Sequence, residues 1–379
     1  MYTPFCPVDV RVAEKKEGLN AVRELLQGTK HKLLVLVPRE LCGTLSLAPF
    51  FTALQGDGHA VQLITEIPSN PTVNELFAKL DALRGQAFLP TALLAIGGGS
   101  CMDMAKGISA MLHLPNTQSL EGVRKAILEK AYCKKHPMID LLCMPTTSGT
   151  GSEVTKWATI WDTDNRQKLS IDCCSCFAKA AILIPEWTVG MPPSLTLSTG
   201  LDALSHAMEA FWSVQRTPLA QALSFTAIQK IHDFLPKVLQ SPDSIAFRRE
   251  MSLASLLAGL AFSQTHTTAC HSISYPLTML FGISHGYAAA LTLSGVMRRN
   301  EKVMPEIETI RKIFAADGGF SAWLEPLCTG IQTLRLTAFG VSKSDIAAIV
   351  ALTFTAGRMD NNPICFTASE VADILNECL

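Results

Sequence analysis

Short apolar runs alternate with helix-length segments through the first half of the chain, and this alternation stops near residue 190. Apolar runs of this length, separated in this way, are typical of buried parallel strands joined by crossover helices. We therefore predict an α/β domain over residues 1–190. Its strands are expected at residues 32–37, 61–64, 92–96, 141–144 and 180–184.

The second half follows a helical period instead. Beyond a proline-containing segment at residues 185–193, apolar residues recur every three or four positions, as in Leu197, Leu201 and Leu204. This spacing gives each helix one apolar face. We predict an all-helical domain over residues 191–379, so the fold class is α/β plus all-α. The sequence has no internal repeat and no low-complexity tract.

The charge balance excludes some classes of partner. The 379 residues include 32 Lys and Arg against 33 Asp and Glu, which gives a formal net charge of −1. A chain so balanced offers no basic surface to nucleic acid or to an anionic membrane. Its mean hydropathy is +0.25, yet no apolar run reaches the roughly 18 residues of a membrane span. The N-terminus lacks the basic and apolar regions of a signal peptide, so we expect a cytoplasmic protein.

Twelve cysteines are expected to be reduced thiols, because a cytoplasmic chain rarely carries a disulfide framework. Cys173, Cys174 and Cys176 form the one cluster. A metal site is an alternative interpretation, but the paired C-x₂₋₄-C modules of such sites are missing. We interpret the cluster as part of a strand with small apolar side chains.

The predicted strand at residues 92–96 is followed at once by three glycines, residues 97–99, and by Ser100. A helix that begins here offers backbone N–H groups and the positive end of its dipole to a pyrophosphate. Ser100 and Asp103 have capping-box spacing, which predicts Ser100 as the N-cap. The alternative is a tight turn that needs glycine for backbone geometry alone. The loop matches neither G-x-G-x-x-G nor the NTPase loop.

A second loop of hydroxyls and glycines, residues 145–155, follows the strand predicted at 141–144. By composition alone it could be any surface loop. Ligands collect at the carboxyl edge of open α/β sheets, however, and two such loops after neighbouring strands would meet there. We therefore expect both loops to contact ribose and phosphate oxygens.

One carboxylate and three imidazoles in the second half form a candidate metal site. Asp202 and His206 are four residues apart and share one helix face. His271 and His285 lie within residues 251–297, which contain no Asp, Glu, Lys or Arg. Pro276 and Gly282 separate them, so we expect two helical segments. Such a set suits Fe²⁺ or Zn²⁺.

A lone histidine on a helix is more often an ordinary core or surface residue than a ligand. We assign that ordinary role to the histidines outside the candidate site. They are His31, His59, His113, His136 and His232.

Four motifs in this order resemble the iron-containing (group III) alcohol dehydrogenase family. They are GGGS-x-x-D-x-A-K at 97–106, P-T-T-x-G-T-G-S-E-V-T at 145–155, T-G-x-D-A-L-x-H-A-x-E at 199–209, and H-x₁₃-H-G at 271–286. The resemblance implies a Rossmann-like dinucleotide domain, a helical metal domain and catalysis in a cleft between them. It also implies a hydride transfer between a nicotinamide and a small aldehyde or primary alcohol.

The resemblance assigns roles residue by residue. Asp202, His206, His271 and His285 match the family's metal ligands, with Fe²⁺ the expected ion and Zn²⁺ the alternative. The positions expected to bind NAD or NADP are Gly97, Gly98, Gly99, Ser100, Asp103, Thr146, Thr147, Ser152, Val154 and Lys168. Relatives often dimerise, so a homodimer is expected.

Two positions depart from the family pattern. Tyr275 stands where many members carry a proton-relay histidine, and His266 is close in sequence. We predict Tyr275 and His266 as catalytic residues, with a core aromatic as the alternative for Tyr275. After the first predicted strand, Pro38 and Arg39 replace the aspartate that commonly binds the adenosine ribose. Arg39 favours a 2′-phosphate and hence NADPH, unless it is simply solvated.

Candidate cations near the substrate are Lys156, Arg216 and Arg358. Because the stretch 271–278 resembles phosphonoacetaldehyde-reducing members, phosphonoacetaldehyde is an alternative substrate. Two rival classes are a dehydroquinate synthase-like lyase that uses NAD and a metal, and a catalytically silent scaffold. The signature at 145–155 argues against the lyase, and the complete ligand set argues against the scaffold.

Overall fold

The structure is a computed structural model that describes residues 5–134, 137–354 and 357–379. The chain divides into two compact units. The N-terminal unit runs to Thr188 but leaves out Ser148–Gly151, and the C-terminal unit is Val189–Leu379 together with that tetrapeptide. The sequence prediction assigned the tetrapeptide to the first domain. Histidine 136, named above among the ordinary histidines, lies outside the described residues.

Within the described part of the N-terminal unit, six strands form one parallel sheet in the order β1-β8-β5-β4-β2-β3. All five predicted strands are present. A further edge strand, β1, was not predicted. The bounds are β1 Asp9–Val12, β2 Lys32–Leu36, β3 Ala60–Ile64, β4 Ala92–Gly97, β5 Asp140–Pro145 and β8 Ala180–Leu183.

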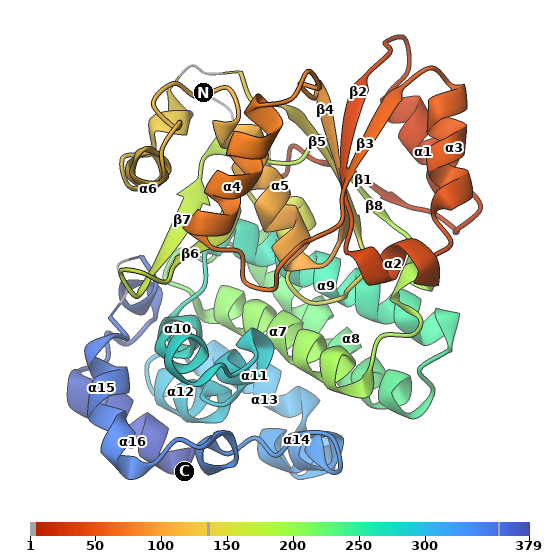
Figure 1. Cartoon of the computed structure of the whole chain (residues 1–379). Coiled ribbons are helices and arrows are strands. Elements are labelled where there is room, and N and C mark those ends of the chain that lie inside the picture. Colours follow the sequence, from red (N-terminus) through yellow and green to blue (C-terminus); the bar gives the residue numbers. More distant parts are fainter. Residues whose placement is uncertain (1–4, 135–136, 355–356) are drawn as a thin grey trace. The chain divides into compact units, whose positions relative to one another are not determined.

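Helices cover both faces of this sheet (Figure 1). On one face, Leu33 and Val35 of β2 pack in a cluster with Val22 of α1 and Leu54 of α3. On the other face lie α4 and α5 (Figure 1). The helices of this unit are α1 Gly18–Leu25, α2 Arg39–Thr44, α3 Ala48–Gly56, α4 Val73–Arg84, α5 Gly99–Met111 and α6 Leu120–Leu128.

The order of the strands reverses at β2. The chain passes from β2 to β3 on one side and then returns to β4 on the other side of β2. In open α/β sheets a ligand crevice opens at the carboxyl ends of the two strands that flank such a reversal. The first glycine loop and Pro38 follow those two strand ends.

Two local predictions in this unit were wrong or incomplete. An antiparallel hairpin, β6 Trp157–Asp162 and β7 Gln167–Asp172, was not predicted. The cysteine cluster is not in a strand, because Cys174–Cys176 forms a 3₁₀ turn. All twelve cysteines, which lie in the described residues, are free thiols as expected.

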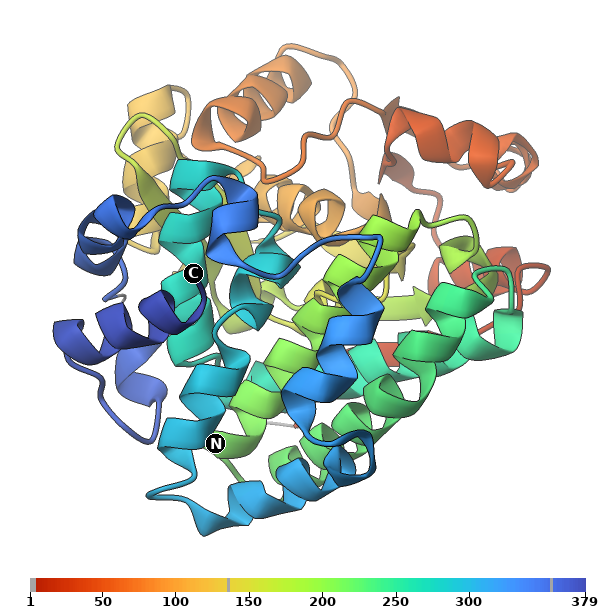
Figure 2. The same cartoon turned by 90° about the horizontal axis from the view of Figure 1, so that it is seen from below.

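The C-terminal unit has only helices among its described secondary structure elements, which confirms the predicted α/β plus all-α fold. Helices α7, α8 and α9 lie side by side in both views (Figures 1 and 2). The helices are α7 Pro193–Trp212, α8 Pro218–Gln240, α9 Ile245–Thr265, α10 Ala269–Phe281, α11 His285–Ala290, α12 Leu293–Asn300, α13 Glu308–Ile313, α14 Phe320–Cys328, α15 Ile346–Ala351 and α16 Ala368–Glu377.

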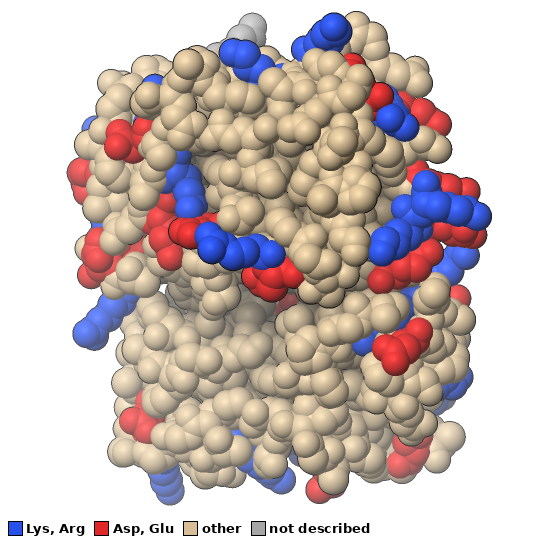
Figure 3. Space-filling view, turned by 45° about the vertical axis from the view of Figure 1, so that its right-hand side comes forward, with Lys and Arg blue, Asp and Glu red and all other residues tan. Residues whose placement is uncertain are grey.

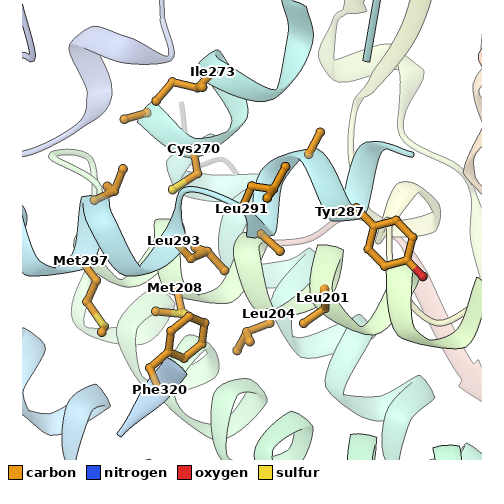
Figure 4. Packing of buried hydrophobic residues seen from close by; sticks show 14 of the residues in the cluster. Leu201, Leu204, Met208, Cys270, Ile273, Tyr287, Leu291, Leu293, Met297 and Phe320 are labelled. Atoms are coloured by element: carbon orange, nitrogen blue, oxygen red, sulfur yellow. The ribbon is translucent and has the colours of Figure 1, made fainter. Parts of the chain in front are cut away.

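The core of the helical unit is a continuous apolar cluster. Leu204 and Met208 of α7 meet Leu293 and Met297 of α12 in it, and Cys270 of α10 also belongs to it (Figure 4). Close packing of this kind fixes side-chain positions to within fractions of an ångström. The polar residues that α7 and α10 carry on their other faces are therefore held on a rigid base.

Acidic and basic side chains lie next to one another on the face shown in Figure 3, with no large patch of one sign. Ion pairs occur in both units, such as Arg23 with Asp57 and Lys230 with Glu250. Among the described residues, no helix combines the length and the apolar character needed to cross a bilayer.

Candidate functional site

The first glycine loop opens a helix at the carboxyl edge of the sheet. β4 ends at Gly97, and α5 begins at Gly99 with Gly98 as its extended N-cap residue. The free N–H groups of the first turn of α5 therefore face the end of the sheet, where a pyrophosphate would bind. The predicted cap at Ser100 was wrong. Ser100 lies inside the first turn, and its Oγ accepts a hydrogen bond from Asn70 N at 3.1 Å.

The second loop lies directly against the first. Thr146 N donates to Gly97 O at 3.1 Å. A Cβ on Gly98 would come within 3.2 Å of Thr147 Oγ1, so a glycine permits this close approach. The structure therefore brings together the predicted cofactor residues of both loops.

A buried charge network connects α5 to the end of the second loop. Asp103 accepts hydrogen bonds from Ser152 Oγ at 2.8 Å and from Thr159 N at 2.9 Å. Lys106, only 1% exposed, donates to Ser152 O at 2.6 Å and to Trp157 O at 2.9 Å. Burial raises the pKa of Asp103 and lowers that of Lys106. Each charged group nonetheless has polar partners inside the protein.

Sequence reasoning assigned no role to Lys106. The available signal was a lysine in the middle of a predicted helix whose other residues, apart from Asp103, are apolar or small. Val154 and Lys168 complete this region: Val154 is fully buried in the 3₁₀ turn Ser152–Val154, and Lys168 lies on β7.

Arg39 is the first residue of α2, directly after Pro38. Its side chain is 74% exposed and forms an ion pair with the equally exposed Glu66, with Nη2 2.9 Å from Oε1. A guanidinium here is accessible to an anionic ligand. Glu66 is a competing partner that sequence reasoning missed, because it follows β3 and becomes a neighbour only through the pairing of β2 with β3.

The four predicted metal ligands come from three helices of the C-terminal unit. Asp202 and His206 lie one turn apart on α7, His271 lies on α10, and His285 begins α11. Asp202 Oδ1 lies 3.8 Å from His206 Nε2, 3.6 Å from His271 Nε2 and 3.9 Å from His285 Nε2. The donor atoms of Asp202, His271 and His285 all lie within 4.8 Å of one another.

The expected break between His271 and His285 is present. α10 continues through Pro276 and ends at Gly282, whose φ of 66° is a left-handed conformation that suits glycine. The chain then turns, and α11 starts again at His285. Because of this turn, His271 at the start of α10 and His285 at the start of α11 both lie close to Asp202 of α7.

The donor set fits a divalent metal ion. Asp202 Oδ1 and His271 Nε2 are buried and have no hydrogen-bond partner among the described residues. Leaving such atoms unpaired is costly, and a cation between them removes that cost. Although burial favours the neutral acid, the surrounding imidazoles lower the pKa of Asp202, so the carboxylate stays charged. Burial lowers the pKa of His206 to about 4, so this ring is neutral and keeps a lone pair for a ligand bond.

Two contacts hold the rings of His206 and His271, two of the predicted ligands, from behind. His206 stacks on Phe262 with ring centroids 4.0 Å apart, and its Nδ1 lies 3.4 Å from Gly149 O. His271 Nδ1 contacts a carboxylate oxygen of Glu209, which is buried on α7. Glu209 was part of the quoted motif at 199–209, but sequence reasoning gave it no role.

The two predicted catalytic residues lie in different surroundings. Tyr275, only 5% exposed, lies one turn after His271, and its ring is parallel to that of His285 with centroids 6.2 Å apart. His266 caps the end of α9 with a φ of 58°, a strained value for a non-glycine residue. Its Nδ1 accepts a hydrogen bond from Arg358 Nη1 at 3.3 Å. Tyr275 is thus next to the ring of His285, a predicted ligand, and His266 is paired with Arg358.

The other two candidate cations have partners of their own. Lys156 Nζ lies 3.5 Å from Asp172 Oδ1 and over the ring of Trp157. Arg216 Nη1 donates to Ser213 O at 3.3 Å.

Comparisons with known proteins agree with this geometry. Residues 10–185 match the family described as iron-containing alcohol dehydrogenase, and residues 196–379 match the C-terminal part of the Fe-containing alcohol dehydrogenase family. The chain is 34% identical to 1-propanol dehydrogenase PduQ of Citrobacter freundii over 345 residues, which is 86% of this chain and 87% of that protein. It is 34% identical to phosphonoacetaldehyde reductase of Streptomyces viridochromogenes over 239 residues, 62% of this chain and 60% of that protein.

Solved structures give the same result. An iron-containing alcohol dehydrogenase from Thermotoga maritima is 29% identical, with a TM-score of 0.82 and coverage of 100% of this chain and 99% of that one. Sulfoacetaldehyde reductase from Bifidobacterium kashiwanohense, solved with NAD⁺, is 25% identical, with a TM-score of 0.80 and coverage of 100% and 98%. From the matches over both halves and the identity to its relatives, this chain is a member of the iron-containing alcohol dehydrogenase family, and it is an oxidoreductase.

Proposed function

We propose that the chain transfers hydride between a nicotinamide dinucleotide and a small aldehyde or primary alcohol, with Fe²⁺ held by Asp202, His206, His271 and His285. The observation that carries this proposal is a pair of buried atoms, Asp202 Oδ1 and His271 Nε2, that have no hydrogen-bond partner in the described part of the chain. They lie where the three helices that carry the proposed ligands meet. When bound, the divalent ion supplies Lewis-acid stabilisation of the charge that develops on the substrate oxygen. Zn²⁺ suits the same donors.

The protein supplies position and a largely buried setting, since Asp202, His206 and His271 are all buried. Asp202 contributes the negative charge that attracts a cation, and the neutral ring of His206 contributes a lone pair. No Asp, Glu, Lys or Arg occurs at residues 251–297, which include α10 and α11, so these two helices add no mobile charge of their own that would screen the site. In the N-terminal unit, we propose that the pyrophosphate binds at the start of α5, beside Thr146 and Thr147.

The decisive experiment is a metal analysis of the purified full-length protein, followed by NADH and NADPH oxidation against a panel of small aldehydes. About one equivalent of iron or zinc and turnover of at least one short-chain aldehyde are expected. A dehydroquinate synthase-like lyase would contain metal but oxidise no added NAD(P)H. A scaffold would contain no metal and show no turnover.

We propose NADPH as the preferred cofactor, with NADH as the alternative. Pro38 has no carboxylate to bind the ribose hydroxyls, and the accessible Arg39 provides a cation for a 2′-phosphate. Arg39→Ala should lower kcat/KM for NADPH about tenfold, the worth of one exposed charge-assisted hydrogen bond, and leave the value for NADH unchanged. A wild-type preference for NADH would refute the proposal.

Phosphonoacetaldehyde is the second candidate substrate. Two of the relatives reported above are named for the reduction of phosphonoacetaldehyde and sulfoacetaldehyde, both small aldehydes with an anionic tail. Of the three candidate cations, Arg358 is the one that contacts a predicted catalytic residue, His266. Arg358→Met should lower kcat/KM for phosphonoacetaldehyde and not for propanal. If wild-type enzyme reduces phosphonoacetaldehyde no better than propanal, this candidate fails.

Tyr275 is proposed to replace the relay histidine, because its ring lies parallel to that of His285 and it follows His271 by one turn of α10. Tyr275→Phe keeps the ring and removes the hydroxyl, so turnover should fall and its pH profile should change. Full turnover across the pH range would leave Tyr275 as a core aromatic. The homodimer and the cytoplasmic location expected from the sequence stay predictions.

A further inference from the structure

Glu209 is a fully buried carboxylate that caps a neighbouring helix. It lies on α7, three residues after His206, and its side chain has no exposed area. Oε1 accepts hydrogen bonds from Thr268 N at 3.0 Å, Thr268 Oγ1 at 2.8 Å and Cys270 N at 2.8 Å. The first N–H groups of a helix have no partner within the helix, so Glu209 satisfies donors that α10 would otherwise bury unpaired.

The other oxygen of the same carboxylate contacts a metal-ligand ring. Glu209 Oε2 is the hydrogen-bond partner of His271 Nδ1. Two backbone N–H groups and a hydroxyl already donate to this carboxylate, which marks it as a hydrogen-bond acceptor. The proton of a neutral His271 ring must then be on Nδ1. The lone pair is left on Nε2, the atom that lies 3.6 Å from Asp202 Oδ1.

We propose that Glu209 is a positioning residue that selects the Nδ1–H tautomer of His271 and thereby sets the affinity of the site for a divalent metal. The proposal rests on the proposed function, since it requires His271 to be a ligand. An ordered carboxylate behind a ligating imidazole fixes both the tautomer and the ring orientation. Here the flanking residues Met208 and Cys270 belong to the packed core, so neither α7 nor α10 can shift to relax the contact (Figure 4).

Glu209→Gln separates capping from tautomer selection. The amide oxygen can still accept from the N–H groups of α10, but the amide nitrogen then donates toward Nδ1. His271 would carry its proton on Nε2 and lose the lone pair that faces Asp202. We expect the Kd for Co²⁺ or Zn²⁺, titrated into metal-free full-length protein, to rise about 10- to 100-fold. The Tm of the metal-free protein should change little.

Thr268→Val is the matched control. It removes the hydroxyl that donates to Glu209 and accepts from Trp212 Nε1, and it leaves the Glu209–His271 contact in place. We expect a lower Tm with a metal Kd within about threefold of wild type, since the ligand-orienting contact remains. ¹⁵N spectra of histidine-labelled protein, assigned with His271→Gln, report the tautomer directly and should change in Glu209→Gln alone.

The outcomes separate the two proposals. If wild-type protein binds neither ion, the proposed metal site itself fails. If wild type binds and Glu209→Gln binds equally well, only the positioning role is rejected. The role is also rejected if Glu209→Gln and Thr268→Val lose affinity in the same proportion to their fall in Tm, because Glu209 would then act through stability alone.

Discussion

The two units each bury a group of charged side chains, and the two groups differ in how completely they are satisfied. Around Asp103 and Lys106, each charged group has hydrogen-bond partners inside the N-terminal unit. Around Asp202, the described residues leave one carboxylate oxygen and one imidazole nitrogen without any. Buried polar groups are nearly always paired in native proteins. A buried network whose polar atoms all have hydrogen-bond partners therefore indicates a structural role. A buried network that leaves polar atoms without partners indicates a binding site for a ligand such as a metal ion.

Removing the charge of the unsatisfied group should have the largest effect. Asp202→Asn is expected to lower metal content to near zero and kcat/KM about 10³-fold, which corresponds to the several kcal/mol that a metal contributes to a developing oxyanion. The metal-free variant should be no less stable than metal-free wild type, because it no longer buries an unpaired anion. Metal analysis, aldehyde reduction and thermal melts measure the three effects. Normal metal content in the variant would show that the unpaired oxygen of Asp202 does not mark a metal site.

The satisfied network should respond in the opposite way. Lys106→Met removes one of two lysines, Lys106 and Lys168, whose charge favours ionised Asp103, and it takes the ammonium donor from the carbonyls of Ser152 and Trp157. Leaving such buried groups unpaired costs about 1–3 kcal/mol. We expect a lower unfolding free energy in urea together with normal metal content per folded molecule. Lys106→Arg serves as the control that keeps the charge. A variant with wild-type stability would mean that Ser152 and Thr159 satisfy Asp103 without Lys106.

Metal removal should affect only the helical unit. A ligand that binds the folded state at 100 times its Kd stabilises it by about 2.7 kcal/mol, and a chelator removes that amount. Thermal melts with and without chelator should show a lower transition for the helical unit in wild type. Asp202→Asn, the control, should show no change. A chelator effect in that variant would place the metal elsewhere.

Acid should weaken the ion pair between Arg124 and Asp162 in the N-terminal unit, with a smaller effect on stability. Although burial opposes it, Arg124 lowers the pKa of Asp162, with Nε 2.7 Å from Oδ2. A carboxyl whose pKa is lower in the folded state adds stability above its unfolded pKa near 3.9, and this stability is lost as the pH falls below that value. Asp162→Asn should therefore lower Tm by a few degrees at pH 7 and by less at pH 3. An equal loss at both pH values would contradict this.

The sequence alone was sufficient to predict those secondary structure elements whose residues follow one clear pattern of hydrophobicity. Five strands were predicted because their residues are continuously apolar, as a strand buried on both faces requires. The edge strand β1 was missed, since Asp9–Val12 is short and alternates polar with apolar residues. The β6–β7 hairpin was missed because its turn contains no glycine, and Arg166 takes the left-handed conformation with a φ of 51°.

The site shows the same limit. Spacing was enough to place Asp202 and His206 on one helix face, because four residues make about one turn. Spacing could not reveal Glu209, whose partners are 59 to 62 residues away along the chain. The cap of α5 was predicted wrongly, because Ser100 and Asp103 have the spacing of a capping box but instead bind Asn70 and the second loop.

The tetrapeptide Ser148–Gly151 has a consequence for how this protein can be divided. The chain crosses from one unit to the other three times, after residues 147, 151 and 188. Cleaving the chain at one peptide bond therefore cannot separate the two units. A fragment that begins at Val189 would lack Gly149, whose carbonyl contacts the ring of His206. A gene fusion that exchanges the first half for that of a relative at one junction near residue 189 would therefore place the relative's tetrapeptide, and not the native one, against His206. The two halves are expected to exchange cleanly only when this tetrapeptide is kept with the C-terminal half.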